Sequence, residues 1–300
     1  MTSPRSATRE VRLTPEPFGP GSAVVLFGLA SAIAWGAGDF GGGWASRRAP
    51  VLGVSLVVQV MGVALAVGLA LLAGEPGLEP AGIAISSAAG VVVVVGILGL
   101  YQGLAVGRMG VVAPVTGVIA AVMPVVAGIA MAGLPAASVL AGIVLAFLAV
   151  VLVSRIPGEE GRRSGIEFAL VAGVGIGCFN ILIGLLPDGH VFGPLVVVKV
   201  SAAVVMAVIV VLGGRTWRVP RHTLPVVIAV GLFDMAGNAL YVLATQAGRL
   251  DVAATLSSLY PVTTILLAVL LLGERVTRSH AVGIAAAVAA IALIGAGSSG

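Results

Sequence analysis

Long, nearly uncharged runs of apolar residues alternate with short polar clusters along most of the chain. A helix needs about 20 apolar residues to cross roughly 30 Å of hydrocarbon, so each run of this length predicts one membrane-spanning helix. Ten such runs lie at residues 22–40, 50–73, 81–106, 111–132, 137–154, 165–186, 191–213, 224–246, 251–272 and 279–298. The pattern therefore predicts an all-α integral membrane protein with ten transmembrane helices.

The most polar internal segment, residues 155–164, divides the predicted helices into two sets of five. We expect a first five-helix unit at 22–154, a linker at 155–164 and a second five-helix unit at 165–298. Residues 1–21 contain Arg5, Arg9 and Arg12 and have no apolar core of the signal-peptide kind. We interpret them as a flexible polar tail.

The two predicted units resemble each other when the sequence is shifted by 141 residues. This shift places Asp39 on Asn180, Arg108 on Arg249 and Thr116 on Ser257 without a gap. Each unit has an odd number of helices, so the second would enter the membrane in the opposite sense to the first. The sequence thus predicts two inverted five-helix repeats, an architecture typical of secondary transporters.

Composition excludes a soluble globular protein, because 59% of the 300 residues are hydrophobic and only 9% are charged. Soluble domains carry roughly a quarter of their residues as charged side chains. The formal net charge of +4 comes from basic residues scattered in loops at the ends of apolar runs. We interpret them as topology signals and expect no nucleic-acid partner.

Several kinds of catalytic centre lack their sequence signatures in this chain. The single cysteine, Cys178, cannot form an intramolecular disulfide, and the three histidines, His190, His222 and His280, lie near different loops. There is neither an HExxH motif nor a GxxxxGK[ST] phosphate loop. We therefore expect no enzyme, no metal site and no cofactor.

Three ionisable residues lie inside predicted helices: Asp39, Lys199 and Asp234. Such groups are costly in a membrane and are candidates for function. Asp39 follows Trp35 by one helical turn, so an aromatic wall would stand beside an anion that can hold an ammonium group. The alternative is a solvated residue at the helix end, because Gly41 follows closely. For Lys199 we favour a side chain that snorkels to the headgroups over a buried role.

Asp234 is too short to snorkel from the centre of its predicted helix and must face protein or water. Asn238 and Tyr241 share its helix face and extend a polar stripe that suggests a cavity wall, the alternative being a structural hydrogen bond to a neighbouring helix. Other polar residues could line the same path, although bonding to their own backbone is an equally good explanation for the hydroxyls. They include Asn180, Ser257, Tyr260, Gln59, Tyr101 and Thr116.

One segment of the second half, residues 238–295, carries a resemblance to a known family. Its most specific parts are Leu-Tyr-Pro-Val at 259–262 and Leu-Leu-Leu-Gly-Glu-Arg at 270–275. These resemble the second repeat of the EamA-type transporters in the drug/metabolite transporter superfamily. The first half resembles the family less strongly. It lacks a counterpart of the Glu-Arg ending and has Ala-Gly-Leu-Pro at 132–135 instead.

The resemblance implies ten helices and the carriage of small organic molecules across the cytoplasmic membrane, without naming a substrate. On the positive-inside rule, eleven arginines in the loops after odd-numbered helices, against four elsewhere, place both termini outside. The resemblance, in contrast, implies termini inside.

We interpret the chain as a secondary transporter whose site lies near the midplane between the two halves. The favoured version is a proton-coupled exporter of amino acids or related metabolites, in which Asp39 or Asp234 exchanges a proton for a cationic substrate. A facilitator or importer of another metabolite class is the alternative within transport. A lipid-modifying intramembrane enzyme or a receptor that transports nothing is the alternative outside it. The expected partners are a small-molecule substrate and the lipid bilayer, with a homodimer left open.

Overall fold

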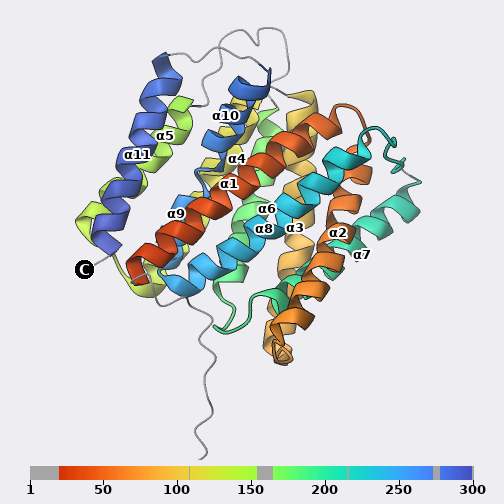
Figure 1. The fold of residues 1–300 in the computed structure, drawn as a ribbon, viewed down its shortest axis with the longest axis horizontal. Helices are drawn as coiled ribbons and strands as arrows, with labels where there is room; N and C mark the ends of the chain where they lie inside the picture. The colour runs from red at the N-terminus through yellow and green to blue at the C-terminus, as the bar shows by residue number, and fades with distance from the viewer. Residues whose placement is uncertain (1–19, 108, 154–164, 215, 273–277, 299–300) are drawn as a thin grey trace, which may run out of the picture.

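The computed structural model describes residues 20–107, 109–153, 165–214, 216–272 and 278–298. The described helices are α1 (Pro20–Ser46), α2 (Val51–Ala73), α3 (Pro80–Val106), α4 (Met109–Ala132), α5 (Ala137–Val153), α6 (Ile166–Gly184), α7 (Phe192–Gly213), α8 (Leu224–Ala247), α9 (Leu250–Ser257), α10 (Tyr260–Leu272) and α11 (Arg278–Ser298) (Figure 1). The all-α prediction is confirmed for these residues. Residues 1–19 of the predicted tail and the predicted linker at 155–164 lie outside the described part.

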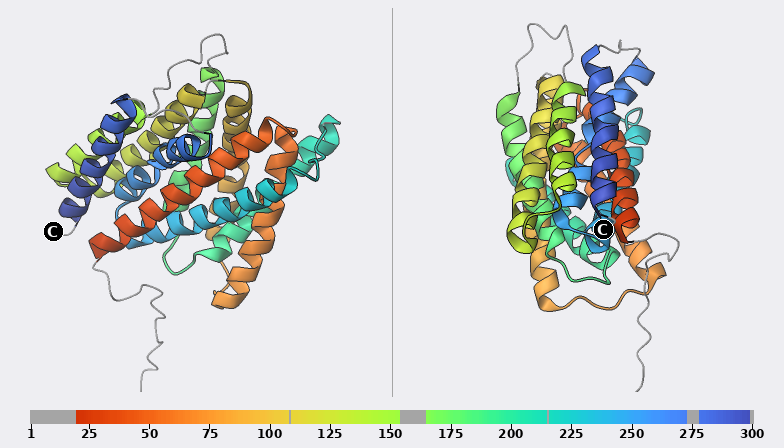
Figure 2. Two further views of the ribbon diagram at one scale, coloured as in Figure 1. Left: turned by 45° about the horizontal axis from the view of Figure 1, so that its top comes forward. Right: turned by 90° about the vertical axis from the view of Figure 1, so that its left-hand side faces the viewer.

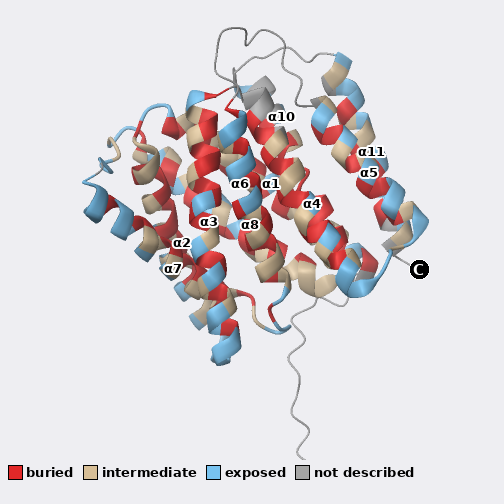
Figure 3. Ribbon diagram, turned by 180° about the vertical axis from the view of Figure 1, so that it is seen from behind, coloured by how far each residue is buried: buried red, intermediate tan, exposed pale blue. Residues whose placement is uncertain are grey.

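Seven of the described helices are long and apolar enough to cross a membrane, namely α1, α2, α3, α4, α6, α7 and α8. Shorter apolar stretches, Ala137–Leu152 and Ala281–Ile294, lie in α5 and α11. Large apolar side chains such as Val91, Val144 and Val204 are exposed in mid-helix, and exposed positions recur along the outer helices (Figure 3). An apolar outer surface of this kind suits a lipid environment. The chain is therefore a multi-pass membrane protein.

The first helix is longer than the sequence predicts. α1 continues through Gly41, Gly42 and Gly43 to Ser46, instead of ending at Phe40. The glycines allow close packing: a side chain at Gly41 would meet Val230 of α8, and one at Gly42 would meet the ring of Tyr101. Asp39 therefore lies inside the helix, and the alternative of a solvated helix-end residue is wrong.

The predicted helix at 251–272 is divided into two. α9 ends at Ser257 and α10 begins at Tyr260, with a turn in which the Leu259 amide donates to the Leu256 carbonyl. Pro261 has no amide hydrogen to donate to the carbonyl of Ser257, which is one physical reason for a break at this point. The two prolines inside α4, Pro114 and Pro124, leave that helix continuous.

Helices of the two halves pack against each other in pairs (Figures 1 and 2). α1 lies along α8, and α3 lies along α6. α2 packs against α7, and α5 packs against α11. α4 packs on α6, while α9 and α10 pack on α1. The main interface of the bundle is thus the one between the first five helices and the later ones.

A carboxylate of the first half caps a helix of the second half. The side chain of Glu75, in the loop between α2 and α3, accepts hydrogen bonds from the backbone amides of Val191, Phe192 and Gly193 at 2.7–3.0 Å. These amides begin α7 and have no acceptor within the helix, and the helix dipole also favours an anion there. Glu75 therefore fixes the start of α7 to the loop between α2 and α3.

Replacing Glu75 with Gln is expected to lower the free energy of unfolding by about 0.5–2 kcal/mol, the range measured for lost helix caps. Thermal unfolding of the purified protein in detergent measures this loss. Glu79→Gln is the matched control, because Glu79 lies in the same loop, is exposed and makes no side-chain cap. Equal melting temperatures for the two variants would contradict a capping role for Glu75.

A second contact between the halves lies at the same end of the bundle. The Arg249 guanidinium donates to the carbonyl oxygens of Ala132 and Gly133, at 3.2 and 2.6 Å, at the end of α4. The same group pairs with the buried carboxylate of Asp251, at 2.8 Å, in the first turn of α9. Like the Glu75 cap, this contact holds together the end of the bundle at which α2, α4, α6 and α8 finish.

Candidate binding site

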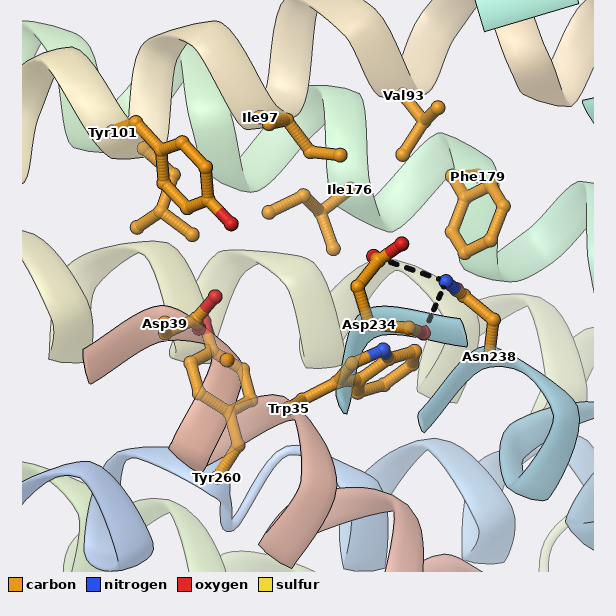
Figure 4. Close-up of a pocket in the computed structure, with 12 residues that line it drawn as sticks. Trp35, Asp39, Val93, Ile97, Tyr101, Ile176, Phe179, Asp234, Asn238 and Tyr260 are labelled. Carbon is orange, nitrogen blue, oxygen red and sulfur yellow. Dashed lines mark hydrogen bonds between the residues drawn. The ribbon is translucent and has the colours of Figure 1, made fainter. Parts of the chain in front are cut away.

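A cavity of about 60 Å³ lies among α1, α3, α6, α8 and α10 (Figure 4). Such a volume has room for a few water molecules. Its lining consists of Trp35, Gly38, Asp39, Val93, Ile97, Leu100, Tyr101, Ile176, Phe179, Asp234, Asn238 and Tyr260. Helices of both halves therefore build it, and it contains five of the residues proposed from the sequence: Trp35, Asp39, Asp234, Asn238 and Tyr260.

Asp234 has a partner that the sequence does not reveal. The Lys199 ammonium group, from α7, lies 2.5 Å from its Oδ2, and the side chain of Lys199 is only 2% exposed. The aliphatic stem of Lys199 lies against Gly62 of α2. The snorkelling interpretation of Lys199 is therefore wrong, because its charged end points into the bundle and forms an ion pair there.

Asn238 completes the environment of Asp234. Its Nδ2 donates to Oδ1 of Asp234 at 3.1 Å and to the Asp234 carbonyl at 2.7 Å, as the dashed lines in Figure 4 show. The ammonium and the amide thus occupy different oxygens of one carboxylate. Within the described residues, Asp234 is compensated in charge and also hydrogen-bonded.

Asp39 differs from Asp234 in this respect. Among the described residues its carboxylate makes no hydrogen bond and no ion pair, although it lines the same cavity. Tyr101 of α3 and Tyr260 of α10 stand beside it (Figure 4). Asp39 is therefore the carboxylate that remains available to a proton or to a ligand.

Aromatic side chains form part of the cavity wall. Trp35 and Tyr241 pack with ring centroids 5.3 Å apart, and a side chain at Gly237 would collide with the Trp35 indole. The hydroxyl of Tyr260 is buried, its residue being 5% exposed, and has no hydrogen-bond partner among the described residues. A buried hydroxyl without a partner is costly, so a ligand that bonds to it would gain from doing so.

Three of the proposed site residues lie outside the cavity lining. The Tyr241 hydroxyl donates to the carbonyl of Asn180 at 3.3 Å, and Asn180 itself donates to the Ala120 carbonyl at 3.5 Å. The Ser257 hydroxyl donates to the carbonyl of Gly28 at 3.3 Å. These residues connect helices around the cavity. The Tyr241 ring, which is not part of the lining, packs against the ring of Trp35, which is part of it.

Of the other polar residues considered, Tyr101 lines the cavity, whereas Gln59 and Thr116 do not. Thr116 donates to the Ala169 carbonyl at 3.3 Å.

The apolar lining residues carry no chemical signal of their own in the sequence. The shift of 141 residues could have found four of them: Val93 corresponds to Asp234, Ile97 to Asn238, Ile176 to Trp35 and Phe179 to Gly38. Both members of each pair line the cavity.

Comparison with known proteins agrees with this reading of the fold. Residues 163–296 match the model of the EamA-like transporter family. One solved structure, described only as a crystal structure of a protein, aligns with a TM-score of 0.74 at 14% identity and covers 91% of this chain and 96% of its own. At that identity the likeness concerns the fold alone. No curated protein sequence matches the chain. The predicted resemblance is thus confirmed: over residues 163–296 this chain is similar to the EamA-like transporter family, a family of membrane transporters.

Proposed function

We propose that the chain is a secondary transporter that exports small organic metabolites, amino acids or related compounds, across the cytoplasmic membrane by proton-coupled alternating access. The observation that carries this proposal is the cavity lined by both halves, with two carboxylates at its surface. A site shared by two halves is what a rocking motion around a bound substrate requires.

The proposed architecture is ten transmembrane helices in two inverted repeats, 22–154 and 165–298, joined by the segment 155–164. Here α6, α7, α8 and α11 are the counterparts of α1, α2, α3 and α5, and α9 with α10 is the counterpart of α4. The packing supports this assignment, because exchanging counterparts turns the α1 and α8 contact into the α6 and α3 contact. In each of the remaining pairs, α2 with α7 and α5 with α11, the two helices are counterparts of each other. A pseudo-twofold axis in the membrane plane produces such a pattern.

Alternating access requires contacts that close one end of the bundle and break when the site opens toward that end. The hydrogen bonds from α7 to Glu75 and from Arg249 to the end of α4 both cross between the halves at the end that contains 74–79 and 133–136. We propose that they close this end in the conformation described here.

Counterflow in proteoliposomes tests the proposed function. Vesicles with purified protein are loaded with unlabelled amino acids and fixed-charge organic cations, then diluted into traces of each labelled compound in turn. A carrier produces a transient, saturable overshoot for its own substrates, whereas a receptor or an enzyme produces none. An imposed pH gradient distinguishes a proton-coupled exporter from a facilitator, because the gradient drives net transport only by the coupled exporter.

Asp188→Asn is the matched control for these measurements, since Asp188 is an exposed loop carboxylate outside the cavity. Its overshoot should equal that of the unaltered protein. Folded protein that shows no overshoot with any compound of the panel would overturn the proposal.

A further inference from the structure

We infer that the cavity binds small organic monocations, amines or ammonium compounds without a carboxylate, and that Asp39 is the anion that holds their charge. This inference rests on the proposed transport function and narrows its substrate class from amino acids and related compounds to amines.

The charged groups at the cavity do not cancel one another. Asp39 and Asp234 contribute two carboxylates, and Lys199 compensates Asp234 through the ion pair at 2.5 Å. When these groups are ionised, one negative charge remains on Asp39. An uncompensated charge at membrane depth is costly, so one monovalent cation or one proton would stabilise the site.

The cavity has an apolar side and a charged side. Val93, Ile97, Ile176 and Phe179 form an apolar wall that faces the side from which Asp39 projects (Figure 4). A ligand that satisfies both sides has a charged head and an apolar body. A metal ion would find too few oxygen ligands in such a wall, because hard cations take six or more.

Aromatic rings and a hydroxyl group surround the position that the charged head of the ligand would take. The rings of Trp35, Tyr101 and Tyr260 line the cavity and can attract an ammonium group through their π faces, those of Tyr101 and Tyr260 beside Asp39 (Figure 4). The buried hydroxyl of Tyr260, which has no partner among the described residues, can accept a hydrogen bond from an ammonium N–H. A primary ammonium group therefore meets an anion, aromatic faces and a free acceptor at one place.

The same lining argues against a carboxylate on the ligand. None of the twelve described lining residues is Lys, Arg or His, and the Lys199 ammonium is already bound to Asp234. The carboxylate of an amino acid would lie in a low-dielectric cavity near two other carboxylates, and like charges repel strongly there. The zwitterion should thus bind more weakly than the amine that lacks its carboxylate.

A proton and the amine would compete for Asp39. The charged and titratable groups that face it are Asp234 with its partner Lys199, from α8 and α7, and Tyr101 and Tyr260, from α3 and α10. Asp39 is the one carboxylate among them without a cation. Amine binding should weaken as the pH falls, because protonation of Asp39 removes the negative charge.

Binding of three small compounds with the same two-carbon chain tests the inference: ethylamine, alanine and propionate. Isothermal titration calorimetry on the full chain in detergent should show saturable binding of the amine. Alanine is expected to bind at least about tenfold more weakly and propionate more weakly still. Asp39→Asn should weaken amine binding by at least about tenfold, since a hydrogen bond to a charged group is lost. Asp188→Asn, which changes an exposed loop carboxylate outside the cavity, should retain binding.

Three results would overturn the inference: no binding of the amine, binding of alanine or propionate as tight as that of the amine, or an unchanged amine affinity in folded Asp39→Asn protein. Counterflow measurements show whether the inferred substrate class or the proposed transport function is at fault. If an amino acid exchanges while the amine does not bind, the substrate class is wrong and transport stands. If the amine binds through Asp39 but no compound exchanges, the site stands and transport is wrong.

Discussion

Replacing Lys199 with Met is expected to remove most of the folded protein. The substitution leaves the Asp234 carboxylate without its cation in a buried position, and breaking a buried ion pair by removing one partner costs about 3–5 kcal/mol. The amount of monodisperse protein after extraction in mild detergent, together with its melting temperature, measures the loss. The snorkelling interpretation, in contrast, predicts a mild effect.

A second substitution distinguishes the effect of losing the ion pair from that of a general packing defect. Lys199→Met combined with Asp234→Asn leaves no unpaired charge, so the double variant should recover much of the folded protein that the single variant loses. Val200→Met is the matched control, because Val200 is the neighbouring residue of α7 and faces outward. A single Lys199→Met variant as stable as the Val200→Met control would contradict the ion pair.

Replacing Asp39 with Asn is expected to abolish transport while the protein stays folded. Among the described residues no cation depends on Asp39, so the substitution leaves no charged partner unpaired. Removal of the charge takes away the anion that we propose for binding the substrate or the proton, and such charge-assisted bonds contribute roughly 1.5–3 kcal/mol, or about 10- to 100-fold in affinity. Initial rates of counterflow at equal amounts of reconstituted protein measure the effect.

The corresponding variant of the other carboxylate, Asp234→Asn, should behave differently from Asp39→Asn. From the sequence alone, Asp234→Asn should abolish transport without reducing the amount of folded protein. The ion pair changes this expectation, because Lys199 would be left buried and unpaired, so we expect loss of folding as well. If Asp39→Asn also lost its fold, or if it transported at the normal rate, the different roles assigned to the two carboxylates would be wrong.

Much of the fold could be predicted because hydrocarbon imposes one length scale on every spanning helix. The run lengths therefore locate most of the helices within a few residues of their observed bounds. The two main differences have separate causes, close helix packing in α1 and a proline between α9 and α10. Gly41 and Gly42 do not end α1, since they lie where α8 and Tyr101 approach it closely, and Pro261 marks a break that apolar composition conceals.

The candidate site was predictable only in part. A carboxylate in an apolar run signals a buried polar site, which identified Asp39 and Asp234. Their neighbours depend on how helices from distant parts of the chain pack. No local pattern connects Lys199 with Asp234, which are 35 residues apart and on different helices. Helical spacing correctly groups Tyr241 with Asp234 on one face, but it cannot determine that Trp35 lies between Tyr241 and the cavity.

If Asp39 binds either a proton or an organic cation, as we propose, then binding of the amine must displace the proton from it. Ethylamine is titrated into the purified protein in weakly buffered solution containing a pH indicator, at several pH values. We expect close to one proton to leave per amine bound at the acidic end, this release to decline as the pH rises, and the Asp39→Asn variant to release none. Amine binding without proton release at every pH, or equal release from the Asp39→Asn variant, would contradict the proposal.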